Sequence, residues 1–152
     1  MKTFRHDKKG TARAVLLGVV LLGTTACGLL MNHDVERPSA GEFGMGPRPS
    51  VQGIYTVSLE SDQPVRPRQM QTLRVRIQDT GGTGIDGAAV TVDGGMPEHG
   101  HGLPTRPRVT ANPGGGIYEI DGVRFNMGGW WEFRLAISAP SGSDVVTFNL
   151  AL

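Results

Sequence analysis

Hydrophobic and polar residues alternate with a period of two along most of the chain after residue 53. Residues 73–77 place Leu, Val and Ile at every second position, with arginines between them, and residues 131–137 repeat the pattern with Trp, Phe, Leu and Ile. Such alternation is typical of strands that bury one face. Further runs of this kind lie at residues 55–59, 88–92, 118–120, 123–127 and 146–152, and a short edge strand is expected at residues 108–110.

Glycine and proline residues separate these runs. Glycine occupies 23 of the 152 positions and proline occupies 10. No segment has a convincing helical period. About seven short strands spaced by turns predict an all-β fold, specifically an immunoglobulin-like antiparallel β-sandwich over residues 53–152. The alternation changes parity at Asp121-Gly122, which indicates a bulge or a bend there.

Two adjacent tryptophans must face opposite sides of a regular strand. Trp131 continues the hydrophobic alternation and is the expected core anchor of the sandwich. Trp130 then faces outward, where it would cap a loop or form part of a partner surface.

The first 27 residues have the pattern of an export signal. Lys8, Lys9 and Arg13 precede an apolar run at residues 14–22, and a basic segment before such a run is typical of secretory signals. Three outcomes stay open: lipidation of Cys27, ordinary cleavage, or an uncleaved membrane anchor, since apolar character continues to residue 31. Each places the following domain outside the cytoplasm, in the periplasm or cell envelope.

Cys27 is the only cysteine of the chain, so the exported domain contains no internal disulfide. It follows Thr-Thr-Ala, which resembles a bacterial lipobox although Thr24 stands where leucine is preferred. We expect a lipid at Cys27 to attach the protein to a membrane. Residues 28–52 are rich in Pro and Gly with little apolar periodicity, and they predict a flexible tether.

The net charge of +1 is the sum of a basic N-terminal region and a mildly acidic remainder. The signal region carries five basic residues and one acidic residue, which leaves ten arginines and 13 acidic residues in the rest. A mildly acidic domain lacks the broad basic surface of nucleic-acid-binding proteins. Nucleic acid is therefore not an expected partner.

The residues with metal-binding chemistry concentrate in Met96–Pro104, directly after the predicted strand at 88–92. Met96, His99 and His101 supply a thioether and two imidazoles, a combination that favours copper, with the thioether selecting Cu(I). In an extended segment the two imidazoles would point to the same side. If the sheet ends coincide, Met127 would complete a His2Met2 site. Glu98 would suit a harder ion or orient an imidazole from outside the ligand set.

The alternative is that this stretch is only a turn. His99 and His101 would then lie on a solvated loop, and Met96 and Met127 would close the open end of the sandwich. An enzyme is not expected, because the sequence contains no nucleophile elbow, phosphate-binding loop or dinucleotide fingerprint. The single cysteine lies in the signal and cannot act as a catalytic nucleophile.

Several motifs resemble those of the YtkA-like domain. They are Met96-Pro97-Glu98-His99-Gly100-His101, Ile117-Tyr118-Glu119-Ile120-Asp121-Gly122 and Phe125-Asn126-Met127-Gly128-Gly129-Trp130-Trp131. The resemblance covers about residues 51–152 and extends to FixH-like periplasmic proteins. It implies a small exported or membrane-anchored immunoglobulin-like domain, and some relatives are associated with copper handling or cytochrome oxidase assembly.

Two functions follow from these observations. The leading hypothesis is a membrane-tethered, extracytoplasmic copper-binding protein that acts as a chaperone or sequesters copper, with a periplasmic or membrane metalloprotein as partner. The alternative is a metal-free module for the assembly of a membrane complex such as cytochrome oxidase, which would dock through Trp130 and the loop at residues 96–104.

Overall fold

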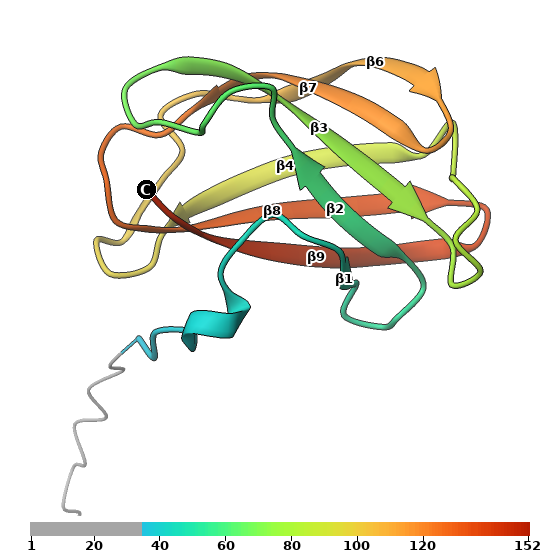
Figure 1. The fold of residues 1–152 in the computed structure, drawn as a ribbon, viewed down its shortest axis with the longest axis horizontal. Helices are drawn as coiled ribbons and strands as arrows, with labels where there is room; N and C mark the ends of the chain where they lie inside the picture. Colours follow the sequence, from blue (N-terminus) through green and yellow to red (C-terminus); the bar gives the residue numbers. More distant parts are fainter. Residues whose placement is uncertain (1–34) are drawn as a thin grey trace, which may run out of the picture. The chain divides into compact units, whose positions relative to one another are not determined.

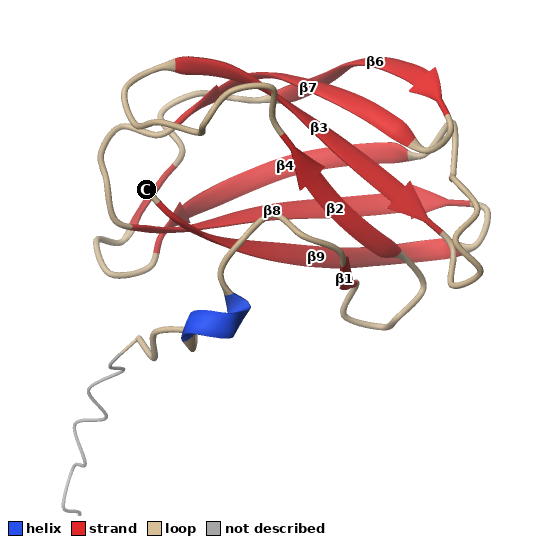
Figure 2. Cartoon of the chain, viewed as in Figure 1, coloured by secondary structure: helices blue, strands red, loops and turns tan. Residues whose placement is uncertain are grey.

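The computed structural model describes residues 35–152, and nearly all of its regular structure is antiparallel strand (Figures 1 and 2). The short 3-10 helix η1 (Ala40–Glu42) is the only helix among these residues. The strands are β1 (Arg48–Pro49), β2 (Thr56–Glu60), β3 (Met70–Gln78), β4 (Ala89–Met96), β5 (His101–Gly102), β6 (Arg108–Gly114), β7 (Ile117–Arg124), β8 (Trp130–Ala139) and β9 (Gly142–Ala151).

The strands form two sheets that enclose one core. One sheet has the order β1-β2-β3-β7-β6 and the other has the order β5-β4-β8-β9. The predicted β-sandwich is therefore confirmed. The seven longer strands match the expected number, and the two additional strands, β1 and β5, have two residues each.

The core confirms the period-two pattern. In β3, Leu73, Val75 and Ile77 are fully buried, while the residues between them are partly exposed. The same alternation along β8 and β9 directs their hydrophobic side chains inward. Trp131 lies in the middle of an aromatic cluster with Phe125, whose ring centroid is 5.1 Å away. Burial of these apolar faces between the sheets is the main stabilising contribution to such a fold.

The parity change at Asp121-Gly122 is a bulge inside a single strand. Gln71 pairs with Val123 and Leu73 pairs with Ile120, so two residues of β7 lie opposite one residue of β3. The sequence pattern indicated two alternating runs here, and the structure joins the first run and the start of the second in β7. The bulge lets Ile120 and Val123 both face the core.

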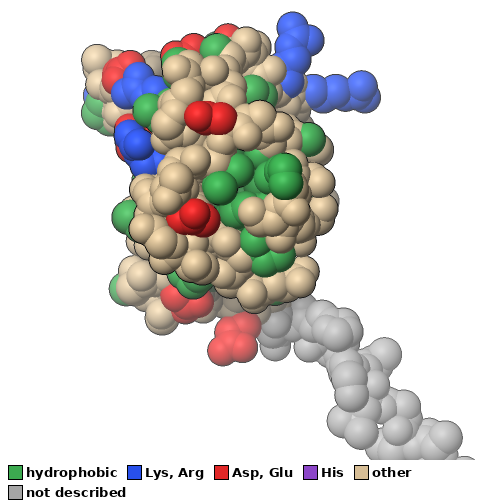
Figure 3. Space-filling model, turned by 90° about the vertical axis from the view of Figure 1, so that its right-hand side faces the viewer, with side chains coloured by type: hydrophobic (Ala, Val, Ile, Leu, Met, Phe, Trp, Pro, Cys, Tyr) green, Lys and Arg blue, Asp and Glu red, His purple; other side chains and the backbone are tan. Residues whose placement is uncertain are grey.

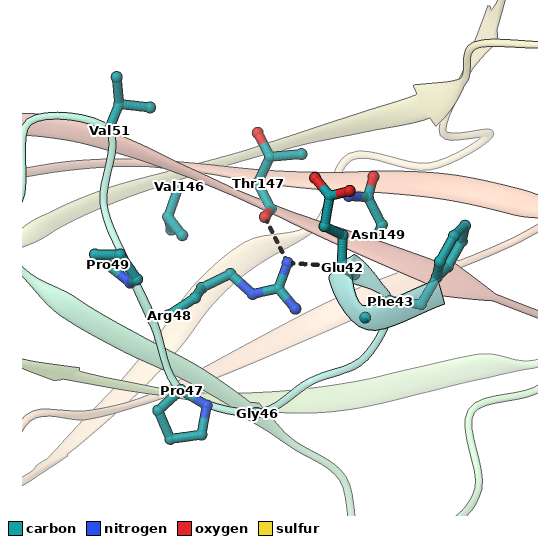
Figure 4. Close-up of a pocket in the computed structure, with 11 residues that line it drawn as sticks. Glu42, Phe43, Gly46, Pro47, Arg48, Pro49, Val51, Val146, Thr147 and Asn149 are labelled. Carbon is teal, nitrogen blue, oxygen red and sulfur yellow. Dashed lines mark hydrogen bonds between the residues drawn. The ribbon is translucent and has the colours of Figure 1, made fainter. Parts of the chain in front are cut away.

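Residues 35–52, part of the segment predicted to be a flexible tether (residues 28–52), contact the sandwich in the structure. Phe43 forms a parallel bridge with Asn149 of β9, and β1 pairs with β2. The guanidinium of Arg48 donates to the carbonyls of Glu42, Gly44 and Thr147 and lies 4.5 Å from the Phe148 ring centroid. Figure 4 shows this side chain crossing an open groove between the segment and β9.

A second anchor fixes the turn between β1 and β2 to the start of β9. The Asp144 carboxylate accepts hydrogen bonds from the Ser50 hydroxyl at 2.6 Å and from the amides of Gln52, Ile54 and Val145. Burial raises the pKa of Asp144, but these hydrogen bonds lower it, and the resulting pKa lies below the usual carboxyl value. Proline and glycine content indicated flexibility, whereas these distant contacts order the segment.

The expected export signal and Cys27 lie outside the described residues. Within residues 35–152, no helix is long and apolar enough to cross a membrane.

Candidate functional site

The Met96–His101 stretch is a short hairpin between the end of β4 and β5. Met96 pairs directly with His101, and Gly95 pairs with Gly102. The amides of His99 and Gly100 both donate to the Met96 carbonyl, at 3.1 and 2.9 Å, and thereby close the turn. Gly100 has φ +66°, a left-handed conformation that glycine adopts without steric cost.

This register brings a thioether and an imidazole together. Residues directly opposite in an antiparallel pair place their side chains on the same face, with Cβ atoms about 4.5–5.5 Å apart. Met96 is buried beneath the hairpin, and the ring centroid of its partner His101 lies 6.0 Å from that of the core residue Trp131. Met96 and His101 are therefore neighbours because of strand pairing.

The imidazoles of His99 and His101 lie close together, but for a different structural reason from the one expected. His99 lies in the turn, so the prediction that one extended segment directs both rings to the same side is wrong. The turn nevertheless brings them together: the ring centroids of His99 and His101 are 5.8 Å apart, and the ring planes differ by 21°. Two imidazoles that bind one ion through bonds of about 2.0–2.1 Å have ring centroids about 5–6.4 Å apart, from a tetrahedral to a linear arrangement.

Met96 is a core residue as well as a candidate ligand. Its side chain is 1% exposed and belongs to the hydrophobic core. The Cε atom lies against Gly129 in the loop before β8, at 2.7 Å from the position that a Cβ atom would occupy there. Gly129 also has φ +127°. The glycine therefore provides both the space for Met96 and the backbone conformation of the loop.

Met127 lies in the same loop before β8, which reaches the same end of the sandwich as the hairpin (Figure 1). Its side chain is half-buried and packs against the core. Its carbonyl accepts a hydrogen bond from the Trp131 indole at 3.0 Å. Met127 and His101 thus both neighbour Trp131, the first through its backbone and the second through its ring.

Glu98 contacts a residue far away in the sequence. Its carboxylate pairs with the Arg37 guanidinium at 3.3 Å. Within residues 35–152, no group of three or more His, Cys, Asp and Glu side chains is arranged to hold a metal ion. Glu98 therefore does not form a three-ligand set with the two imidazoles, and a site at the hairpin depends on the thioethers.

A groove of about 430 Å³ runs along the hairpin. Gly94 and Gly95 lie in its lining, and Asp93, Glu132 and Arg134 lie beside them. Arg134 pairs with Asp93 at 2.9 Å and with Glu132 at 3.0 Å. The hydrogen bond from Arg134 lowers the pKa of Asp93 below its usual value. Arg134 thus offsets one of the two carboxylate charges, and the three side chains together keep a net negative charge beside the hairpin.

Trp130 is not available as a partner surface. Its side chain is 2% exposed, and its indole nitrogen donates to the Asn149 side chain at 3.0 Å. The expected role as an exposed contact is therefore wrong, and its burial at the start of β8 agrees with the capping alternative.

The structure also identifies neighbours of the site that the sequence did not indicate. Arg37 is 61 residues from Glu98 in the chain, and no local pattern connects them. Trp131 was expected in the core, but only the register of β4, β5 and β8 places its ring beside His101.

The opposite end of the sandwich, seen in Figure 3, has a different surface. Hydrophobic side chains gather in one area there, acidic side chains lie to the left of that area, and no histidine is visible. The imidazoles of the described residues, His99 and His101, belong to the hairpin at the other end (Figure 1).

Comparison with known proteins identifies the family. The model of the YtkA-like family matches residues 50–136, a span that contains the hairpin, the loop with Met127 and most of the core strands. No curated protein and no solved structure matches the chain. Because the family model matches more than half of the sequence, the chain belongs to the YtkA-like family.

Proposed function

We propose that this protein is an extracytoplasmic, membrane-tethered accessory protein that binds copper at the Met96–His101 hairpin and acts as a copper chaperone or sequestering protein. His99 and His101 would bind the ion from the surface and Met96 from below, with Met127 as a fourth ligand. Imidazole and thioether ligands suit Cu(I) best. The partner that delivers or receives the ion would be a periplasmic or membrane metalloprotein.

The observation that carries this proposal is the pairing of Met96 with His101. It sets a thioether and an imidazole on one face of the sheet, and the turn adds a second imidazole with its ring centroid 5.8 Å from the first. This spacing is compatible with both rings binding one ion. The burial of Met96 supports a site that is closed from below and approached from solvent through the hairpin.

The location rests on the sequence of the first 27 residues together with the family. A basic segment followed by an apolar run supports export, and Cys27 supports attachment through a lipid. The YtkA-like match supports an accessory role. We assign no catalytic activity, because no nucleophile, base and orienting group are combined in a motif of the sequence.

The alternative function, a metal-free module for assembly of a membrane complex, loses one of its two expected contacts. Trp130 is buried and hydrogen-bonded, which leaves only the hairpin as a docking element. The copper proposal uses residues that the fold brings together, so we favour it.

Competition for Cu(I) against a chromophoric chelator tests the proposal with the full chain in detergent. We expect one equivalent to bind to the wild type and the affinity to fall by at least about tenfold when His99 and His101 are both replaced by asparagine, because loss of even outer-shell partners weakens metal sites by 10–100-fold. His33→Asn is the control, since it removes an imidazole outside the hairpin. Equal Cu(I) affinity of the wild type and the double variant would overturn the proposal.

Tryptophan fluorescence gives an independent measurement. The ring centroid of Trp131 is 6.0 Å from that of His101, and the chain has 2 tryptophans. We expect Cu(II), used as a paramagnetic probe, to quench the emission of the wild type at one equivalent. The double histidine variant should need a large excess.

A further inference from the structure

The ion pair between Arg37 and Glu98 joins the segment before η1 to the hairpin. The two side chains are 56% and 37% exposed, and the Arg37 guanidinium also lies 5.7 Å from the Phe43 ring centroid. Phe43 is itself fixed to β9 through its bridge with Asn149. The contact therefore connects a docked part of the N-terminal segment with the residue next to His99.

Glu98 has the chemistry to change which ion the hairpin prefers. A carboxylate with two imidazoles forms a donor set that suits zinc and other divalent ions, whereas a thioether with two imidazoles suits Cu(I). Glu98 directly precedes His99 in the turn. Even so, the described residues contain no three-membered group of His and acidic side chains arranged around an ion, and the polar contact made by the Glu98 side chain is to Arg37.

We propose that Arg37 is a selectivity-determining residue that holds the Glu98 carboxylate away from the imidazoles and so keeps the hairpin a soft-metal site. This inference rests on the proposed copper function. Arg37 acts through Glu98 and does not itself contact the ion.

The size of the effect follows from competition between the two partners of Glu98. A zinc ion that uses the carboxylate must first separate it from Arg37, so the apparent affinity falls by the fraction of molecules in which Glu98 is free. Exposed ion pairs are worth about 0.2–1 kcal/mol, which corresponds to a factor of about 1.5–5. Removal of Arg37 should therefore raise the Zn(II) affinity by this factor and leave the Cu(I) affinity unchanged.

The test measures Zn(II) and Cu(I) affinities of the full chain in detergent by chelator competition. The variants are Arg37→Ala, Glu98→Gln and the double variant. Arg106→Ala is the control, because it removes one positive charge from another exposed loop residue. We expect Arg37→Ala alone to bind Zn(II) more tightly than the wild type, by about 1.5–5-fold at low salt. The gain should shrink at 1 M salt, where the Debye length is about 3 Å.

The double variant shows whether the gain in Zn(II) affinity caused by Arg37→Ala depends on the Glu98 carboxylate. In the double variant the gain should disappear, and Glu98→Gln alone should bind Zn(II) as the wild type does or more weakly. An unchanged Zn(II) affinity in Arg37→Ala, an equal gain in Arg106→Ala, or a gain that persists in the double variant would each overturn the inference while leaving copper binding intact. Failure of the wild type to bind Cu(I) would instead overturn the proposed function.

Discussion

Replacement of Met96 separates its two roles, because a core residue and a metal ligand respond differently to the same change. Met96→Leu keeps a large apolar side chain of similar volume but removes the thioether. Met96→Ala removes the thioether and also leaves a cavity under the hairpin. The two variants should therefore have similar copper affinities and different stabilities.

The magnitudes follow from the burial of Met96, which is 1% exposed and packed in the core. Truncation of such a residue to alanine costs about 2–5 kcal/mol, whereas the volume-conserving change to leucine costs less than about 1.5 kcal/mol. The stability of a typical domain is about 5–15 kcal/mol, so Met96→Ala removes a large part of it. Loss of the thioether should weaken Cu(I) binding by at least about tenfold in both variants.

Urea unfolding followed by tryptophan fluorescence measures the stability, since Trp130 and Trp131 are both buried. Cu(I) competition measures the affinity under conditions in which each variant is folded. A Met96→Leu variant that is folded and binds Cu(I) as tightly as the wild type would refute the role of Met96 as a ligand. A Met96→Ala variant with the stability of the wild type would refute its role in the core.

Three further predictions concern the fold. Gly129→Ala should destabilise the protein by about 1–3 kcal/mol, because φ is +127° and the new Cβ would lie 2.7 Å from Met96 Cε; thermal unfolding measures this, and Gly41→Ala, which meets no neighbour, should have almost no effect. Arg48→Ala should cost about 1.5–3 kcal/mol through its lost hydrogen bonds and expose the segment before β2 to limited proteolysis; a protease-resistant variant would contradict this. Since the pKa of Asp144 is lowered in the folded state, its stabilising contribution is present above the unfolded carboxyl pKa and is lost as the pH falls through the folded value. Asp144→Asn should therefore flatten the acid branch of a urea-midpoint profile between pH 7 and 3, and a profile parallel to that of the wild type would contradict this.

Most of the sandwich could be predicted from local sequence pattern. Strands such as β3 and β8 bury every second side chain, and this period of two is visible in the sequence because one face of each sheet meets the core. The bulge at Asp121-Gly122 was also visible, since it inverts the alternation. The ordering of residues 35–52 was not, because it depends on contacts with β9 about 100 residues later, such as the hydrogen bond from Arg48 to Thr147.

The candidate site, like the fold, could be predicted from the sequence only in part. The sequence by itself determined that imidazole and thioether groups concentrate at residues 96–101, since that follows from residue identity alone. Only the tertiary structure decided which of these groups lie close together. Strand register pairs Met96 with His101, and the turn at Gly100 brings the His99 ring beside the His101 ring. The Glu98 carboxylate instead forms an ion pair with Arg37, which is distant in the sequence. Side-chain chemistry is a local property, whereas the distances between ligands depend on how strands far apart in the chain align.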